Sequence, residues 1–202
     1  MPLRRVAALL LIATAALLSG CGINAIPSYE EQAKASWAQV LNQYQRRADL
    51  IPNLVETVKA AANFERSTLE AVVNARAKVA QTQIPADILT NPEAMRQFQA
   101  NQGALTAALS KLMVVVEQYP ELKANQNFLT LQAQLEGTEN RIAVARRDFI
   151  DAVRLYNTEL KTIPGRWWAS WFYPDAKEMA QFQAEDAEAA GVPKVDFGTT
   201  SQ

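Results

Sequence analysis

The stretch FLTLQAQLEGTENRIAVARRDFIDAVRLYNTELKTI, residues 128–163, decides the fold class. Apolar residues recur in it at every seventh position: Phe128, Leu135, Ile142, Phe149, Tyr156 and Ile163. A second, interleaved series is small or apolar over most of its length: Leu131, Thr138, Ala145, Ala152 and Glu159. This 3-4 spacing predicts a long α-helix that buries one seam against neighbouring helices, because such positions fall on one side of a helix.

A second segment, residues 92–118, repeats the same spacing. Asn91 precedes it and suits an N-cap, while Pro92 and Glu93 supply the proline and the negative charge that favour a first helical turn. Its seam consists of Met95, Phe98, Gln102, Leu105, Leu109, Leu112, Val116 and Tyr119. We therefore expect a helix that starts close to Pro92.

A third segment, residues 28–82, carries a seam whose phase continues through Pro52. Its members are Trp37, Leu41, Tyr44, Ala48, Ile51, Val55, Val58, Ala62, Leu69 and Val72. An unbroken phase favours one continuous, kinked helix, because a reversal of the chain does not need to preserve it. A hairpin at Pro52 is the alternative, since Asn53 follows the proline and suits a turn.

These segments predict an all-α protein, an extended antiparallel bundle with coiled-coil-like packing. No glycine occurs from Ile23 to Gln102, and no strand-like alternation of useful length appears. Residues 28–190 form the expected bundle, and 191–202 form a flexible tail because that stretch lacks periodicity. The expected helices are three long ones and a shorter C-terminal one, at 28–82, 92–118, 124–163 and 175–190.

The composition removes several classes of protein. The chain has 202 residues, 49% of them hydrophobic, a formal charge of −1, one cysteine and no histidine. A near-neutral chain is not typical of nucleic-acid binding, and the lack of histidine excludes Ser-His-Asp triads and His-ligated zinc. One cysteine allows neither an intramolecular disulfide nor a paired-cysteine metal site. We expect no cofactor.

The first residues carry a targeting signal. Arg4 and Arg5 precede an apolar run, residues 6–18, which fits a signal peptide and falls short of the roughly 20 residues that span a bilayer. The run ends in Leu-Ser-Gly before Cys21, which resembles a bacterial lipobox. The resemblance implies that residues 1–20 are removed, that Cys21 is the acylated N-terminus, and that 21–27 form a tether. The alternative is an uncleaved anchor, or an ordinary signal peptide with an incidental cysteine.

Acylation would hold the protein at a membrane surface, because each buried CH₂ contributes about 0.8 kcal/mol. We expect the body on the periplasmic side of the cell envelope. Residue 22 is glycine, whereas aspartate at that position favours retention at the inner membrane in the lipoproteins that the signal resembles. Gly22 therefore favours the outer membrane over the outer face of the inner membrane.

Four blocks of the body carry a family pattern: RRADLIPNLVETVK (46–59), EQYPELKAN (117–125), NFLTLQ (127–132) and EGTENRIAVAR (136–146). Together they resemble the LemA family of bacterial membrane-attached helical proteins, from about Trp37 to Pro164. The resemblance implies a helical bundle outside the cytoplasmic membrane and no defined reaction. It also implies a protein partner, with TPM-domain membrane proteins as candidates. The chain departs from the family in its lipobox and in its aromatic segment after Pro164.

A polar cluster on the segment 124–163 allows two interpretations. It contains Glu136, Glu139, Arg141, Arg146 and Arg147, within a few helical turns. A carboxylate pair, Glu136 with Glu139, is able to serve acid–base chemistry or bind a divalent cation. The simpler interpretation is a network of salt bridges and hydrogen bonds that fixes the register of the bundle.

An aromatic cluster follows Pro164 and contains Arg166, Trp167, Trp168, Trp171 and Phe172. Tryptophan favours membrane interfaces and protein interfaces, and it also packs in cores. Three roles therefore stay open for this cluster: a hydrophobic plug on the end of the bundle, a surface for a protein partner, or a contact with the bilayer.

The function that these observations favour is that of a membrane-tethered, non-enzymatic lipoprotein, a scaffold or accessory for a membrane-associated partner. Two alternatives remain. One is a carboxylate-based enzyme or divalent-cation binder that uses Glu136 and Glu139. The other is an envelope structural protein that self-associates through its heptad surfaces into a homo-oligomer.

Overall fold

The computed structural model describes residues 22–60 and 64–182, and every regular element in those ranges is a helix. The all-α prediction is therefore confirmed. The elements are α2 (Ala25–Lys59), α3 (Arg66–Gln81), η2 (Ile88–Thr90), α4 (Pro92–Val116), α5 (Pro120–Lys123), α6 (Gln126–Lys161) and α7 (Gly165–Phe172).

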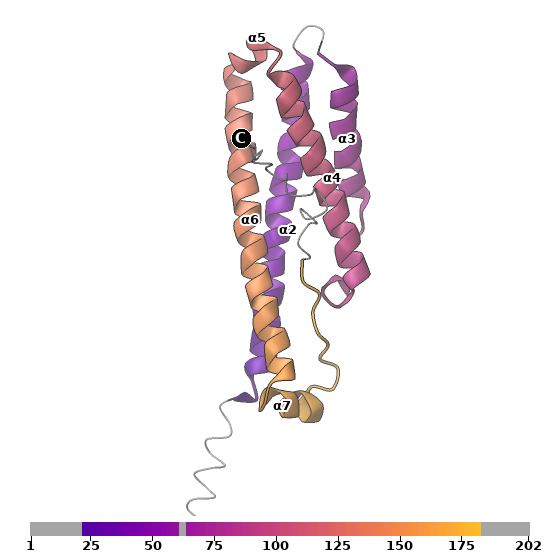
Figure 1. The fold of residues 1–202 in the computed structure, drawn as a ribbon, viewed down its shortest axis with the longest axis vertical. Helices are drawn as coiled ribbons and strands as arrows, with labels where there is room; N and C mark the ends of the chain where they lie inside the picture. Colours follow the sequence, from indigo (N-terminus) through magenta and orange to yellow (C-terminus); the bar gives the residue numbers. More distant parts are fainter. Residues whose placement is uncertain (1–21, 61–63, 183–202) are drawn as a thin grey trace, which may run out of the picture.

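The molecule is an elongated bundle (Figure 1). Helices α2 and α6 run side by side along its whole length and pack chiefly on each other. Helices α3 and α4 form a second pair that lies against one part of this length, and α4 reaches α6 through the short α5. Helix α7 lies across the opposite end, beside the point where the described chain begins.

The two later long helices start at caps. Asn91 Oδ1 accepts a hydrogen bond from the Ala94 amide at 3.1 Å, which confirms the expected start of α4. Asn125 Oδ1 accepts from the amides of Asn127 and Phe128 at 2.9 and 3.2 Å, and starts α6. Both caps satisfy amides that the first turn of a helix leaves without partners. The predicted ranges 92–118 and 124–163 agree with α4 and α6 to within two residues at each end.

The heptad seam of α6 forms the long side of the core. Its members from Phe128 to Tyr156 are buried, whereas the last one, Ile163, lies beyond the helix and is 64% exposed. At the level of Phe149 the core is aromatic, since Trp37 contacts both Phe98 and Phe149 with ring centroids 5.2 and 5.3 Å apart. The seam interpretation therefore holds to the end of α6.

The expected single helix 28–82 is wrong, because α2 ends at Lys59 and α3 is a separate helix that packs on α4. A helix of 55 residues would be about 82 Å long, whereas the 36 residues of α6 extend about 54 Å. Leu69 and Val72 would then lie beyond the end of the bundle. Folding back buries both. The chain does continue as a helix through Pro52, so the hairpin alternative at that proline is also wrong.

Pro52 leaves a backbone carbonyl without its helical donor, and α3 supplies a replacement. A proline has no N–H, so the oxygen four residues earlier, that of Ala48, loses its bond. The Arg76 Nε–H donates to this oxygen at 3.0 Å. The returning helix thus repairs the defect that the proline makes in α2, which explains how Pro52 is accommodated inside a helix.

The expected helix 175–190 is also wrong over its described part. Residues 174–182, which we call the strap, are not helical, and the short C-terminal helix is α7 instead. The side chain of Asn157 accepts from the Met179 amide and donates to the Met179 carbonyl, both at 2.9 Å. The Ala180 amide donates to the Leu89 carbonyl. These tertiary bonds outweigh the helix propensity of the strap. The expected tail 191–202 lies outside the described residues.

The repair of Pro52 predicts a thermodynamic coupling. Arg76→Met leaves the Ala48 carbonyl unpaired in a partly buried place and is expected to lower the free energy of unfolding by about 1–2 kcal/mol. In a Pro52→Ala background the new amide of residue 52 bonds this carbonyl, so the cost of Arg76→Met should fall by about 1 kcal/mol. Urea unfolding of the four variants measures the difference.

Lys78→Met on the exposed side of α3 is the matched control and should show no coupling to Pro52→Ala. Equal costs of Arg76→Met in both backgrounds would show that the hydrogen bond does not compensate for the proline.

Candidate functional site

The interior of the bundle contains a buried arginine. Arg47 on α2 is 1% exposed, and its guanidinium lies between α4 and α6. Nη1 donates to Glu139 Oε1 at 2.9 Å and to Thr106 Oγ1 at 2.8 Å, while Nη2 donates to the carbonyl and the side-chain oxygen of Gln102. The ring of Tyr44 lies 5.0 Å from the guanidinium carbon. One charged group therefore joins three helices.

Glu139 supplies the counter-charge of Arg47 and remains partly exposed to solvent. The Glu139 side chain is 41% exposed, so the carboxylate keeps contact with solvent while its Oε1 atom faces the buried guanidinium. Removing a charge from water is costly unless it is paired and hydrogen-bonded. Four acceptor contacts serve the two terminal nitrogens of Arg47, while its buried Nε has no partner. The four contacts fix the register of α2 against α4 and α6.

Of the predicted carboxylate pair, only Glu139 contacts Arg47. Glu136 is exposed and accepts a hydrogen bond from Gln132 Nε2 at 3.0 Å, one turn away on the same helix. Both carboxylates line one small depression of about 200 Å³, whose other walls include Leu109 and Met113. Within the described ranges, no group of three or more acidic or cysteine side chains is placed to hold a metal ion.

The remaining arginines of the predicted polar cluster diverge. Arg146 lies over the ring of Phe182 in the strap, 4.8 Å from its centroid. Arg141 lines a surface depression between α2 and α6, and Arg147 is exposed beside Asp148. The arrangement around Glu139 corresponds to the network interpretation, whereas the other members serve separate contacts.

Sequence reasoning missed the residue at the centre of this network. Arg47 lies three residues after Tyr44 and four before Ile51, both of which were assigned to the seam. Residues with that spacing share one face of a helix. A charged residue within an apolar seam was therefore the available signal of a buried ion pair.

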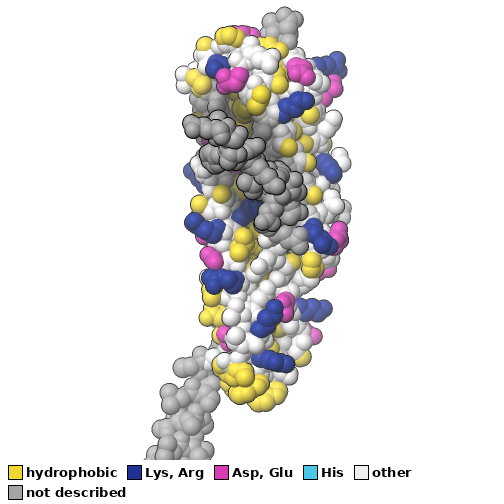
Figure 2. Space-filling model, in the orientation of Figure 1, with side chains coloured by type: hydrophobic (Ala, Val, Ile, Leu, Met, Phe, Trp, Pro, Cys, Tyr) yellow, Lys and Arg dark blue, Asp and Glu magenta, His cyan; other side chains and the backbone are white. Residues whose placement is uncertain are grey.

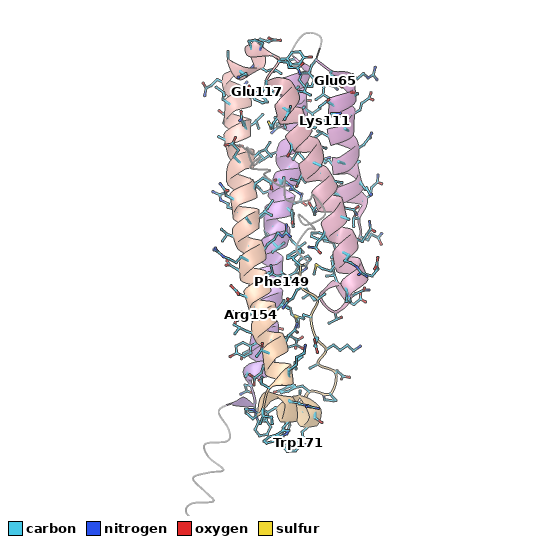
Figure 3. All side chains as sticks on the ribbon, viewed as in Figure 1. Glu65, Lys111, Glu117, Phe149, Arg154 and Trp171 are labelled. Atoms are coloured by element: carbon cyan, nitrogen blue, oxygen red, sulfur yellow. The ribbon has the colours of Figure 1, made fainter. Side chains whose placement is uncertain are left out.

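The second site is the aromatic end of the bundle, formed by α7. Trp168 packs against the core, but Trp167, Trp171 and Phe172 are 49%, 67% and 55% exposed. The plug interpretation therefore applies to Trp168 and not to the other three. Hydrophobic side chains gather at this end of the molecule (Figure 2), and Trp171 projects from it (Figure 3). Arg166 is exposed beside them.

The described chain begins against the same helix. A Cβ atom on Gly22 would lie 3.3 Å from Trp168 Nε1 and 3.7 Å from Pro164 Cγ, so the glycine allows a close approach. The predicted lipid site, Cys21, and the predicted signal peptide lie outside the described residues. Among those that are described, no helix combines the length and the apolar character needed to cross a bilayer.

Fold and sites together define an elongated helical bundle with an apolar core, a buried arginine network that joins three of its helices, and one end that exposes aromatic rings. The model of the LemA family matches residues 36–197. The chain therefore belongs to the LemA family. Membership confirms the resemblance carried by the four sequence blocks, and it does not by itself assign a reaction.

Three curated relatives add to the comparison. The protein LemA of Metamycoplasma hominis is 27% identical over 155 residues, which are 77% of this chain and 63% of the relative. Magnetosome proteins MamQ 1 and MamQ 2 of Paramagnetospirillum magneticum are each 34% identical over 85 residues, 42% of this chain and 30% of theirs. The chain thus matches less than two thirds of the length of each of these relatives.

The Arg47 network predicts unequal roles for the two carboxylates. Glu139→Ala leaves the buried guanidinium without its counter-charge and is expected to cost about 2–3 kcal/mol, since Glu139 is partly exposed. Glu136→Ala, the matched control on an exposed side of the same helix, should change stability by less than about 0.5 kcal/mol. Urea unfolding measures both values.

The same variants test the cation-site alternative. If Ca²⁺ or Mg²⁺ raised the melting temperature of the parent chain, and both Glu136→Ala and Glu139→Ala abolished that rise, the network interpretation would be contradicted.

Proposed function

We propose that this protein is a membrane-tethered helical scaffold of the bacterial envelope, held through a lipid on Cys21 after removal of residues 1–20, and that it supports a membrane-associated partner without catalysing a reaction. Membership of the LemA family supports the helical, envelope-associated part of this description. The lipid tether, the scaffold role and the partner are our proposal.

The observation that carries the proposal is the place of residue 22. It lies at one end of the bundle, against Trp168 and Pro164, rather than along a side. A tether attached one residue earlier leaves the long sides of α2, α3, α4 and α6 free for protein contacts. The 36 residues of α6 correspond to about 54 Å of helix, so those sides extend well away from the tethered end.

The interior supports a structural rather than a catalytic role. Glu139 is engaged by Arg47, whose two terminal nitrogens also donate to Gln102 and Thr106. A catalytic carboxylate needs access to a substrate and a second group in reach of the reacting atom. Glu136, the nearest candidate, is bonded within its own helix. These contacts favour the scaffold over a carboxylate-based enzyme.

The class of partner follows from the place of the tether. A body held at a membrane surface meets membrane proteins at high effective concentration, and the resemblance to the LemA family implies a TPM-domain membrane protein as the candidate. For the membrane itself, Gly22 favours the outer membrane over the outer face of the inner membrane. The body of the protein lies on the periplasmic side of the envelope.

The tether is tested at Cys21. Cells that express the parent chain should incorporate labelled palmitate into it and retain it in the membrane fraction. Cys21→Ala should abolish the labelling, and the chain should appear unprocessed or in the soluble fraction. Ser28→Ala, seven residues later and outside the signal, is the control that should behave as the parent. Equal labelling of parent and Cys21→Ala chains would contradict the lipid tether.

The partner is tested by crosslinking in intact cells from the exposed position Val144 on α6, which lies midway along a long side. We expect a membrane protein to be recovered in a stoichiometric and reproducible amount. A crosslinker at the buried position Phe149 on the same helix is the matched control and should recover nothing. Recovery of copies of this chain alone would favour the self-associating structural protein instead.

A further inference from the structure

Four large apolar side chains at the end of the bundle that carries α7 are exposed. We call Ile163, Trp167, Trp171 and Phe172 the aromatic face; their exposed fractions run from 49% to 67%. Contiguous exposed apolar surface usually marks a site of contact with a protein or a membrane. Hydrophobic side chains gather at this end (Figure 2), and Trp171 projects from it (Figure 3).

The side chains of α7 divide between two tasks. Trp168 and Ala169, with Tyr173 directly after the helix, pack against the core and fix α7 on the bundle. Trp167 and Trp171 are four residues apart, so they lie on one face of α7, which points away from those contacts. The rings of Trp168 and Trp171 meet edge to face at 6.0 Å. The exposed rings are therefore held by neighbours that are partly buried against the core.

The course of the chain indicates what covers the aromatic face. Gly22 lies against Trp168 and Pro164, and the apolar run 6–18 ends four residues before it. Four residues span at most about 14 Å. The proposed anchor is either a lipid on Cys21 or the apolar run itself. In both cases the chain between the membrane surface and Gly22, which lies against α7, spans no more than this distance. The anchor therefore places the bilayer next to the aromatic face.

The net charge of this end does not attract an anionic surface, although Arg166 is exposed beside the rings. The stretches 22–35 and 159–178 together contain four cationic and five anionic side chains. Lys34 is paired with Glu30 and Glu31, and Lys161 is paired with Glu178. A membrane contact here must therefore depend on the rings, and tryptophan has a preference for the headgroup region of bilayers. A neutral lipid surface fits this end as well as an anionic one.

We propose that the aromatic face of α7 inserts into the headgroup region of the membrane that holds the N-terminus, and so gives the bundle a second, neighbouring point of contact. A single flexible tether leaves the bundle free to swivel, whereas two contacts hold its long axis at a defined angle to the membrane. The inference rests on the proposed membrane tether. It adds the surface that orients the scaffold, with the bilayer as the partner.

The test uses tryptophan fluorescence of the chain purified from cell membranes and reconstituted into phosphatidylcholine vesicles. Phosphatidylcholine brominated near the headgroup end of its acyl chains should quench the emission and leave a residual signal from buried Trp37. W167F/W171F should lose most of the quenching with an unchanged melting temperature, because both rings are exposed. W37F is the matched control and should keep the quenching.

The outcomes separate this inference from the tether. A chain that fails to float with the vesicles removes the tether, whereas a chain that floats with unquenched tryptophans leaves the tether intact and overturns the inserted aromatic face. Quenching that W167F/W171F retains would also overturn it. Quenching should be the same with phosphatidylglycerol added and at high salt; dependence on either would show that charge, not the rings, makes the contact. Protection of Trp171 by a second copy of the chain, without quenching, would assign the face to self-association.

Discussion

The charge of Arg47 is the constraint on which the arrangement of the long helices depends. A guanidinium that is 1% exposed needs acceptors at hydrogen-bond distance, and they come from Glu139 on α6 and from Gln102 and Thr106 on α4. Apolar seams alone tolerate a shift of one heptad, because the same kinds of side chain recur every seven residues. One heptad from Glu139 on α6 stand Gln132 and Arg146, neither of which is a carboxylate. A shift of one heptad would therefore remove the counter-charge of Arg47, so the network favours the observed register.

A second constraint ties α3 into the same assembly. Pro52 deprives the Ala48 carbonyl of its helical donor, and Arg76 supplies the replacement from α3. Ala48 is the residue after Arg47, so the guanidinium that α2 extends to α4 and α6 and the carbonyl that Arg76 bonds from α3 belong to adjacent residues of α2. The charged network toward α4 and α6 and the repaired carbonyl toward α3 together make this part of α2 the place where all four long helices are joined.

The sequence allowed the helical class, the seam of α6 and the starts of α4 and α6 to be predicted, because periodicity and caps are local signals. The reversal after Lys59 was missed, since Leu69 and Val72 continue the seam in phase and periodicity does not say which helix a residue packs on. The composition of 175–190 favours a helix, whereas the described strap is held by hydrogen bonds to Asn157 and Leu89. Those partners are distant in the sequence, so local propensity does not reveal them. For the sites, the sequence places Glu139 in a polar cluster of one helix and shows the tryptophans clustered after Pro164. It places Arg47 on the seam face, but which residues of other helices accept from its guanidinium depends on tertiary packing.

The strap also sets how the end of the bundle responds to changes in chain length. Its two-way hydrogen bonds to Asn157 and the burial of Phe182 between Trp37 and Phe149 fix one border of a closed loop, and the end of α6 fixes the other. Helix α7 lies between these borders. Residues added or removed between Lys161 and Met179 would therefore first change the position and tilt of α7, and with them the contacts of Trp168 and Ala169 on the core.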